Sequence, residues 1–233
     1  MIQLTLDLPR RTAFDRSDFL ISDSNIAAVE WIDRWPDWPS VALVLHGPSG
    51  CGKTHLAHLW RERASAVIIA GETMTEARLP HLLAAGPHRV AVDDADRAPE
   101  RALLHLYNSC VEQRGGVLIT ARRPPGSWKV VLGDLRSRLR AVPVVGIDAP
   151  DDALLGAVLV KYFADHQLRV APDVIVYLIR RIERSLDAAE KIVARLDAAA
   201  LSKGGPVTIP LARKVLADAD DQPLSPRTDS AVT

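Results

Sequence analysis

The sequence predicts an α/β fold, in which a doubly wound parallel sheet is followed by a small all-α domain. Three observations favour this fold. Short apolar runs alternate with segments of helical periodicity over residues 41–147. The first of these runs leads into a glycine-rich loop and then a helical segment. After residue 150 only helical periodicity remains. The predicted parts are an N-terminal peptide at 1–11, an α/β domain at 12–149, a helical domain at 150–219 and a disordered tail at 220–233.

The composition predicts a globular protein. Of the 233 residues, 48% are hydrophobic and 25% are charged, which excludes a disordered chain. The formal net charge is zero, which argues against a broad nucleic-acid-binding surface. The two cysteines, Cys51 and Cys110, suggest no disulfide framework and fit a reducing compartment. With neither a signal segment nor an apolar run of about 18 residues, we expect a cytoplasmic protein.

The segment before the glycine-rich loop contains two stretches, each with two interpretations. Residues 3–8 alternate leucine with polar residues, so they are either an edge strand of this domain or a peptide that inserts its leucines into a partner. The polar cluster 22–25 predicts the N-cap of a helix over 26–32. The prolines within 35–39 predict a loop. Residues 19–21 either flank the adenine of a bound nucleotide or belong to the core.

The glycine-rich loop is a phosphate-binding motif. Residues 47–54 read G-x-x-x-x-G-K-T, between a buried strand at 41–45 and a helix from residue 55. Glycines allow successive backbone N–H groups to turn toward one anion, and the positive end of the helix adds to the attraction. Lys53 would contact the β- and γ-phosphates, and the Thr54 hydroxyl would hold Mg²⁺. The predicted nucleotide-binding residues of this region are Gly47, Pro48, Ser49, Gly50, Cys51, Gly52, Lys53, Thr54 and His55.

The remaining elements follow from the same periodicities. The predicted strands are 65–70, 89–92, 115–120 and 142–147. We expect those at 65–70 and 115–120 to be buried in the sheet. The predicted helices of the α/β domain are 75–85, which Pro80 interrupts, and 100–113. The predicted helices of the second domain are 151–166, 172–181, 185–201 and 211–217.

Polar residues at the ends of these strands complete a candidate catalytic site. Asp93 and Asp94 follow the strand at 89–92, which would bring Asp93 to the metal ion and Asp94 to the attacking water. Thr120 ends its strand where a hydroxyl could sense the γ-phosphate, although a strand-ending threonine is commonly a cap. Residues 134–140 contain three arginines at alternate positions. They form either a solvated basic face or a source of arginine for a phosphate, including one on a neighbouring subunit.

Taken together, these motifs resemble the AAA+ ATPases, specifically the DnaA-related family and its Hda group of regulators. The resemblance covers residues 12 to 217. The matching segments are 47–54 for Walker A, 92–94 for Walker B, 119–125 for sensor 1, 135–139 for the arginine-finger box and 184–186 for sensor 2. Phe19, Leu20, Ile21 and Asn25 resemble the segment that frames the adenine, with Leu20 and Ile21 as the predicted contacts. Arg122 departs from the sensor-1 pattern, which has an acidic residue there.

The resemblance extends to the N-terminal segment and favours its interpretation as a peptide. Gln3, Leu4, Leu6 and Leu8 match the form Q-L-x-L-x-L, by which Hda proteins dock on the sliding clamp, the beta subunit of DNA polymerase III. The resemblance thus implies contact with DNA only indirectly, through the clamp. DnaA itself continues beyond its lid into a DNA-reading domain, which we expect this chain to lack.

The resemblance also implies a function. The chain would bind ADP or ATP with Mg²⁺, with Arg184 reaching from the lid toward the phosphates and with at most weak ATPase activity of its own. It would act near the replisome and present Arg138 as a finger to ATP bound on DnaA. Hydrolysis of that ATP would limit re-initiation of chromosome replication. One alternative is an oligomeric AAA+ helicase loader or DNA-remodelling ATPase acting on single-stranded DNA. Another is an adaptor in which the nucleotide is purely structural.

Overall fold

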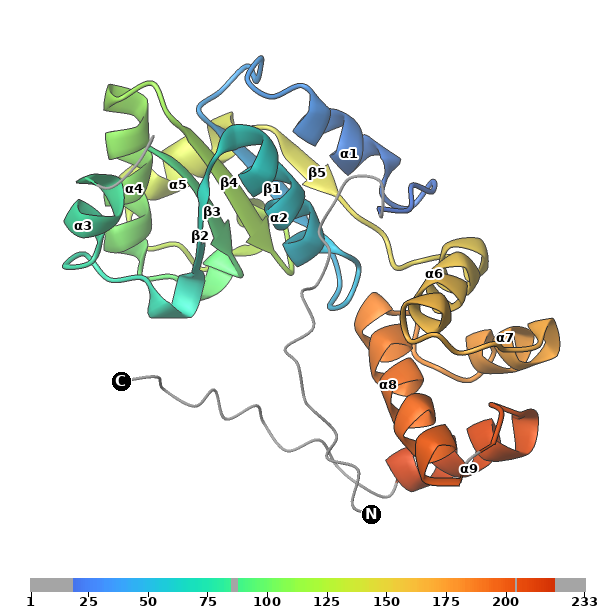
Figure 1. Cartoon of the computed structure of the whole chain (residues 1–233). Coiled ribbons are helices and arrows are strands. Elements are labelled where there is room, and N and C mark those ends of the chain that lie inside the picture. Colours follow the sequence, from blue (N-terminus) through green and yellow to red (C-terminus); the bar gives the residue numbers. More distant parts are fainter. Residues whose placement is uncertain (1–18, 85–87, 204, 221–233) are drawn as a thin grey trace. The chain divides into compact units, whose positions relative to one another are not determined.

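A computed structural model describes residues 19–84, 88–203 and 205–220, which form two compact units (Figure 1). The first unit runs to Asp148, except for residues 49–51, which group with the second unit. The second unit continues from Ala149 and contains only helices and one isolated bridge among its described residues. The predicted clamp-binding peptide and the predicted tail beyond residue 220 lie outside the described residues.

The first unit is built on a parallel sheet of five strands in the order β2-β3-β4-β1-β5, which confirms the predicted fold class. The strands are β1 (Ala42–His46), β2 (Val67–Ala70), β3 (Arg89–Asp93), β4 (Gly116–Ala121) and β5 (Val144–Gly146). From β1, which lies between β4 and β5, the chain crosses to the edge strand β2 and then returns across the sheet through β3 and β4 to β5. Because all strands are parallel, the loop after β1 and the carboxylates at the end of β3 meet at the C-terminal ends of the strands.

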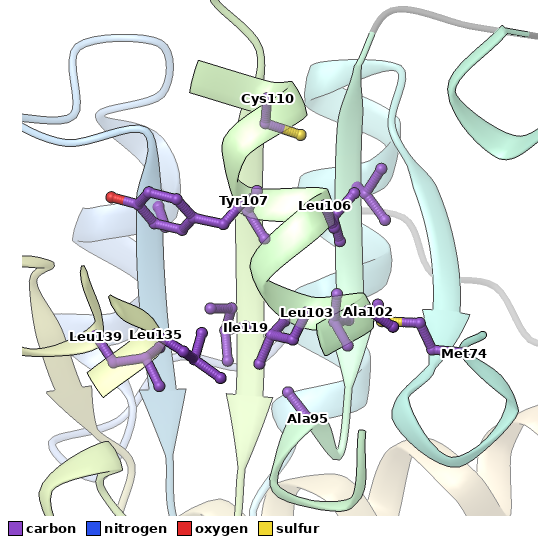
Figure 2. Close-up of a cluster of buried hydrophobic side chains, with 14 of the residues drawn as sticks. Met74, Ala95, Ala102, Leu103, Leu106, Tyr107, Cys110, Ile119, Leu135 and Leu139 are labelled. Atoms are coloured by element: carbon purple, nitrogen blue, oxygen red, sulfur yellow. The ribbon is translucent and has the colours of Figure 1, made fainter. Parts of the chain in front are cut away.

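Helices cover both faces of this sheet. They are α1 (Ile26–Asp33), α2 (Lys53–Ala64), α3 (Leu79–Ala84), α4 (Glu100–Glu112) and α5 (Gly133–Ala141), with short 3₁₀ turns η2 (Gly71–Thr73), η3 (Ala95–Arg97) and η4 (Pro125–Ser127). Alternate strand residues such as Val92 and Ile119 pack with α4 and α5 in one buried cluster (Figure 2). Since successive strand side chains point to opposite faces, Asp93 and Thr120 point to the other face, where α2 packs on β3 and β4.

Three local expectations differ from the structure. The strand predicted as buried at 65–70 is β2, the edge of the sheet, and Val67 is 38% exposed. That prediction was wrong because an apolar run does not reveal whether a strand has neighbours on both sides. The helix predicted at 75–85 begins only at Leu79, which places Pro80 in the first turn, where its missing N–H breaks no helical bond. The last predicted helix likewise begins at Ile209, ahead of Pro210.

Three tryptophans form an aromatic cluster between the α1–β1 loop and α2. The rings of Trp38 and Trp60 are stacked, with centroids 5.4 Å apart and planes 14° apart. Trp35 meets both rings edge-on at 4.8 and 5.2 Å. Trp60 is completely buried, so the cluster joins α2 to the chain that enters β1.

The described residues of the second unit form four helices, which we call the lid. Its helices are α6 (Asp152–Asp165), α7 (Pro172–Ile179), α8 (Leu186–Lys203) and α9 (Ile209–Asp220), as the sequence predicts apart from end residues. Asp151 caps α6 by accepting a bond from the Leu154 amide at 2.7 Å. His166, at the end of α6, lies 2.6 Å from the Asp197 carboxylate on α8. In the parts of both units that the structure describes, no helix has the length and apolarity needed to cross a bilayer.

Candidate nucleotide-binding site

The phosphate loop connects β1 to α2 in the predicted strand–loop–helix order. Gly50 and Gly52 have φ angles of 69° and 101°, which side-chain-bearing residues rarely adopt, so glycine is required at both turns. Gly52 is the N-cap of α2, and Lys53 is its first residue. The Lys53 side chain is 7% exposed, and its Nζ donates to the carbonyls of Gly47 and Pro48 at 2.9 and 2.8 Å. The loop therefore curls around its lysine, whose Nζ would exchange carbonyl oxygens for phosphate oxygens.

A hydroxyl–carboxylate network lies beside this loop. The Thr54 hydroxyl on α2 donates to Oδ2 of Asp93 at 2.8 Å, and the Thr120 hydroxyl on β4 donates to Oδ1 at 2.5 Å. The three residues come from three elements and are separated by up to 66 positions. They converge because Asp93 and Thr120 point to the sheet face on which α2, the helix of Thr54, packs. The structure thus brings together the predicted metal residues, Thr54 and Asp93, and adds Thr120 to them.

Thr120 also holds the second carboxylate residue in place. Its Oγ1 accepts a bond from the Asp94 amide at 3.0 Å while its proton is donated to Asp93. Asp94 has a φ of 50°, which turns the chain sharply after β3. Thr120 is fully buried, and its hydroxyl bonds to both aspartate residues. Sensing of the γ-phosphate by Thr120 stays a prediction.

Burial disfavours the protonated form of two histidines beside the site. Burial lowers the pKa of His58, with Arg61 adding to the decrease and Asp93 opposing it. Burial likewise lowers the pKa of His46, which directly precedes the loop, against the raising influence of Asp148. These imidazoles therefore favour the neutral form beside the lysine and the carboxylates.

The residues present fit a nucleotide-bound magnesium ion. Mg²⁺ takes few protein oxygens and completes its octahedral shell with phosphate oxygens and waters. Thr54 and Asp93 supply two such oxygens within 2.8 Å of each other. No group of three or more His, Cys, Asp or Glu side chains in the described residues could hold a metal ion, so the ion would depend on phosphate ligands.

The predicted adenine segment is held by Asn25. The side chain of this buried residue accepts from the Ser22 amide at 3.0 Å and donates to the Leu20 carbonyl at 3.0 Å. The polar cluster thus forms a turn, and Asn25 ends it as the N-cap residue of α1 without a capping side-chain bond. Leu20 is half-buried and Ile21 is 54% exposed, so both have surface available for a base. Nearby, the rings of Phe19 and His55 lie 5.0 Å apart.

The two predicted arginines have contacts within their own units. The guanidinium of Arg138 on α5 lies 5.2 Å from the centre of the Tyr107 ring on α4. Arg184 pairs with Asp152 in the lid at 2.8 Å, and both side chains are more than half exposed. A finger role for Arg138 and a phosphate contact for Arg184 stay predictions. Sequence reasoning missed Tyr107 as a support for Arg138, because the tyrosine lies on the apolar side of its helix.

Sequence reasoning also missed Glu100, whose carboxylate binds the chain just ahead of α5. The only signal in the sequence is its place at the start of a predicted helix, where acidic residues are common.

Comparisons with known proteins agree with this architecture. Residues 152–216 match the family described as Hda, lid domain. The replication initiator DnaA of Cutibacterium acnes is 26% identical over 201 residues, covering 76% of this chain and 40% of that protein. DnaA of Thermomicrobium roseum is 25% identical over 223 residues, covering 84% and 47%. The chain therefore spans less than half the length of these curated relatives.

Solved structures show the same fold. Domain III of DnaA from Thermotoga maritima superposes with a TM-score of 0.75 at 16% identity, covering 91% of this chain and 98% of that one. AMPPCP-bound DnaA from Aquifex aeolicus gives a TM-score of 0.68 at 18% identity, covering 88% and 69%. A RuvB variant from Thermotoga maritima gives 0.69 at 15% identity, covering 85% and 70%. The chain thus has the AAA+ fold, carries a lid that matches the Hda lid family and is related in sequence to the replication initiator DnaA.

Proposed function

We propose that this chain binds an adenine nucleotide with Mg²⁺ at the loop 47–54. The observation that carries the proposal is the convergence of Thr54, Asp93 and Thr120 beside the buried Lys53. Lys53 supplies positive charge for the phosphates, and the two oxygens of Thr54 and Asp93 suit the ion. The relation to DnaA, one form of which is solved with AMPPCP bound, supports an adenine nucleotide.

We further propose that the chain is a regulator that promotes hydrolysis of ATP bound to DnaA. Arg138 is the finger: it lies half-buried on α5, and a guanidinium supplied in trans can raise phosphoryl-transfer rates about 10³–10⁵-fold. The match of the lid to Hda supports this role over that of an initiator. Hydrolysis would convert DnaA to its ADP form and limit re-initiation.

The remaining parts of the proposal concern partners and turnover. Gln3, Leu4, Leu6 and Leu8 dock on the DNA-loaded sliding clamp, which concentrates the regulator near newly replicated DNA. The ADP-bound form acts on DnaA, and the chain's own ATP turnover is slow. Asp94 and Arg184 then serve the chain's own nucleotide.

The proposal is tested by measuring ATP hydrolysis on DnaA–ATP with the ADP-loaded chain and DNA-loaded clamp, added separately and together. We expect stimulation only from the complete mixture, with Arg138→Ala and Gln3→Ala each abolishing it. Arg138→Ala should still bind ADP, whereas Lys53→Ala should not. Arg101→Ala, an exposed arginine on α4, is the matched control and should stimulate normally.

Three results would contradict the proposal. An absence of stimulation in the complete mixture would exclude the regulator. Turnover of the chain's own ATP that increases with single-stranded DNA, independently of DnaA, would instead indicate a helicase loader or DNA-remodelling ATPase. Clamp binding without any effect of Arg138→Ala on hydrolysis would indicate an adaptor.

A further inference from the structure

The carboxylate of Glu100 binds two successive backbone amides more than 30 residues away. Glu100 is the first residue of α4. Its Oε1 accepts from the Val131 amide at 2.8 Å, and its Oε2 accepts from the same amide at 3.1 Å and from the Leu132 amide at 2.7 Å. A carboxylate that accepts several N–H bonds forms strong, charge-assisted contacts. We call this set of bonds the Glu100 latch.

The latch acts at the start of the helix that carries Arg138. Leu132 is the N-cap residue of α5, and no side chain within the segment caps that helix. Negative charge at a helix N-terminus is favourable because the first amides of the helix lack partners. Asp134 places one negative charge in the first turn of α5, and Glu100 adds from α4 the side-chain bond to the N-cap residue that the segment does not make itself.

The latch also fixes which way the preceding residues face. Val130 and Leu132 pack against the core cluster, while Val131 between them is 82% exposed. The Val131 side chain lies in solvent and adds little apolar packing. The bond from its amide to Glu100 therefore fixes the backbone at this residue. The register in which the chain enters α5 therefore depends on Glu100.

A second contact joins the same two helices at the arginine itself. Tyr107 follows Glu100 by seven residues, which places it two turns along the same side of α4. Its ring lies beneath the guanidinium of Arg138. Leu135 and Leu139 of α5 are buried in the cluster that includes Tyr107 (Figure 2). Hence α4 holds α5 at its start and at Arg138.

We propose that Glu100 is a positioning residue for Arg138, acting through the backbone at the start of α5. This inference rests on the proposed function, because it concerns the arginine that is offered to ATP on DnaA. Removal of the carboxylate frees two amides and the first turn of α5, while the buried leucines keep the helix attached. Arg138 is then displaced, and a displacement of about 1 Å can reduce a rate about 10²-fold.

The experiment compares the full-length chain with Glu100→Ala, Glu100→Gln and the matched control Glu112→Ala. Glu112 is an exposed glutamate at the other end of α4. Each protein is assayed for stimulation of DnaA–ATP hydrolysis with DNA-loaded clamp, for its own ADP affinity, and for hydrogen exchange of the amides at 129–136.

We expect Glu100→Ala to lower stimulation about 10- to 100-fold and to accelerate amide exchange at Val131 and Leu132 by at least about tenfold. ADP affinity should change less than about twofold, because the nucleotide site lies on other elements. Glu100→Gln, which keeps one carbonyl acceptor, should restore part of the stimulation. Glu112→Ala should match the wild type.

The ADP titration separates positioning from a general loss of stability. In Glu100→Ala, ADP affinity should be retained while stimulation falls, because the displacement is confined to α5 and its arginine. Unchanged exchange at Val131 and Leu132 in Glu100→Ala would overturn the latch. Faster exchange with full stimulation, or a loss of ADP affinity as large as the loss of stimulation, would overturn the positioning role. A wild-type chain without stimulation would refute the proposed function and with it the role in hydrolysis, while the exchange data would still decide whether the latch exists.

Discussion

Gly71 allows two parts of the α/β unit to approach closely. It begins η2, directly after the edge strand β2, and lies against the backbone of Asp94. A Cβ at Gly71 would be 2.5 Å from the Asp94 carbonyl oxygen and 3.1 Å from Cα of Ala95. Since ordinary contacts of a Cβ begin at 3.4 Å, Gly71→Ala forces the two backbones apart by about 0.9 Å, the difference from 2.5 Å.

This separation should be costly, because both contacting atoms belong to backbone and cannot rotate away. Overpacking of this kind destabilises a protein by about 1–3 kcal/mol. At about 2–4 °C per kcal/mol for a domain of this size, the midpoint of thermal unfolding should fall by about 2–12 °C. The shift also moves Asp94, whose amide bonds to Thr120, so nucleotide affinity in the presence of Mg²⁺ should fall as well.

The assay is thermal and urea unfolding of Gly71→Ala beside the wild type, together with a titration of Mg²⁺–nucleotide. Gly126→Ala is the matched control, because no atom lies within 4 Å of the position its Cβ would take. A free energy of unfolding within about 0.5 kcal/mol of the wild type, with unchanged nucleotide affinity, would refute the reasoning.

Three further predictions concern α4 and α5. Gly133→Ala at the first position of α5 meets no neighbouring atom and should raise the free energy of unfolding by about 0.4–1 kcal/mol, measured by urea denaturation. Burial raises the pKa of the Cys110 thiol to about 12, so in a Cys51→Ser background a thiol reagent at pH 8 should label Cys110 only as fast as the protein unfolds. Labelling that is independent of denaturant would contradict this burial. The amides of Leu132 and Val131 lower the pKa of Glu100, so the stability advantage of wild type over Glu100→Gln should be complete above its usual value of 4.5 and disappear as the pH falls further. An advantage that persisted to pH 2 would show that charge is not its source.

The fold and the phosphate site could be predicted because they depend on short-range patterns. The motif at 47–54 and the strand that ends in Asp93 each occupy fewer than ten residues, and parallel pairing brings them to one edge. The burial of β2 was mispredicted, because exposure at an edge depends on strand order, which an apolar run does not encode. The use of Asn25 to fix the adenine segment likewise depends on a turn that propensities alone do not resolve.

The supports of the candidate site were less accessible to sequence reasoning. Glu100 contacts backbone amides, which carry no side-chain signature, across 31 and 32 positions. Thr120 was expected at the end of a strand, but its two bonds to the aspartates depend on strands that are neighbours in space and not in sequence. Such contacts become visible only once the order β3-β4-β1 is known.

The aromatic cluster of the α/β unit has a practical consequence. All five tryptophans of the chain precede residue 149, and three of them are packed together at Trp60, whereas the lid contains tyrosine and phenylalanine. Indole emission therefore reports on the nucleotide-binding unit alone. Intrinsic tryptophan fluorescence can thus distinguish unfolding of this unit from unfolding of the lid, and no added dye is needed.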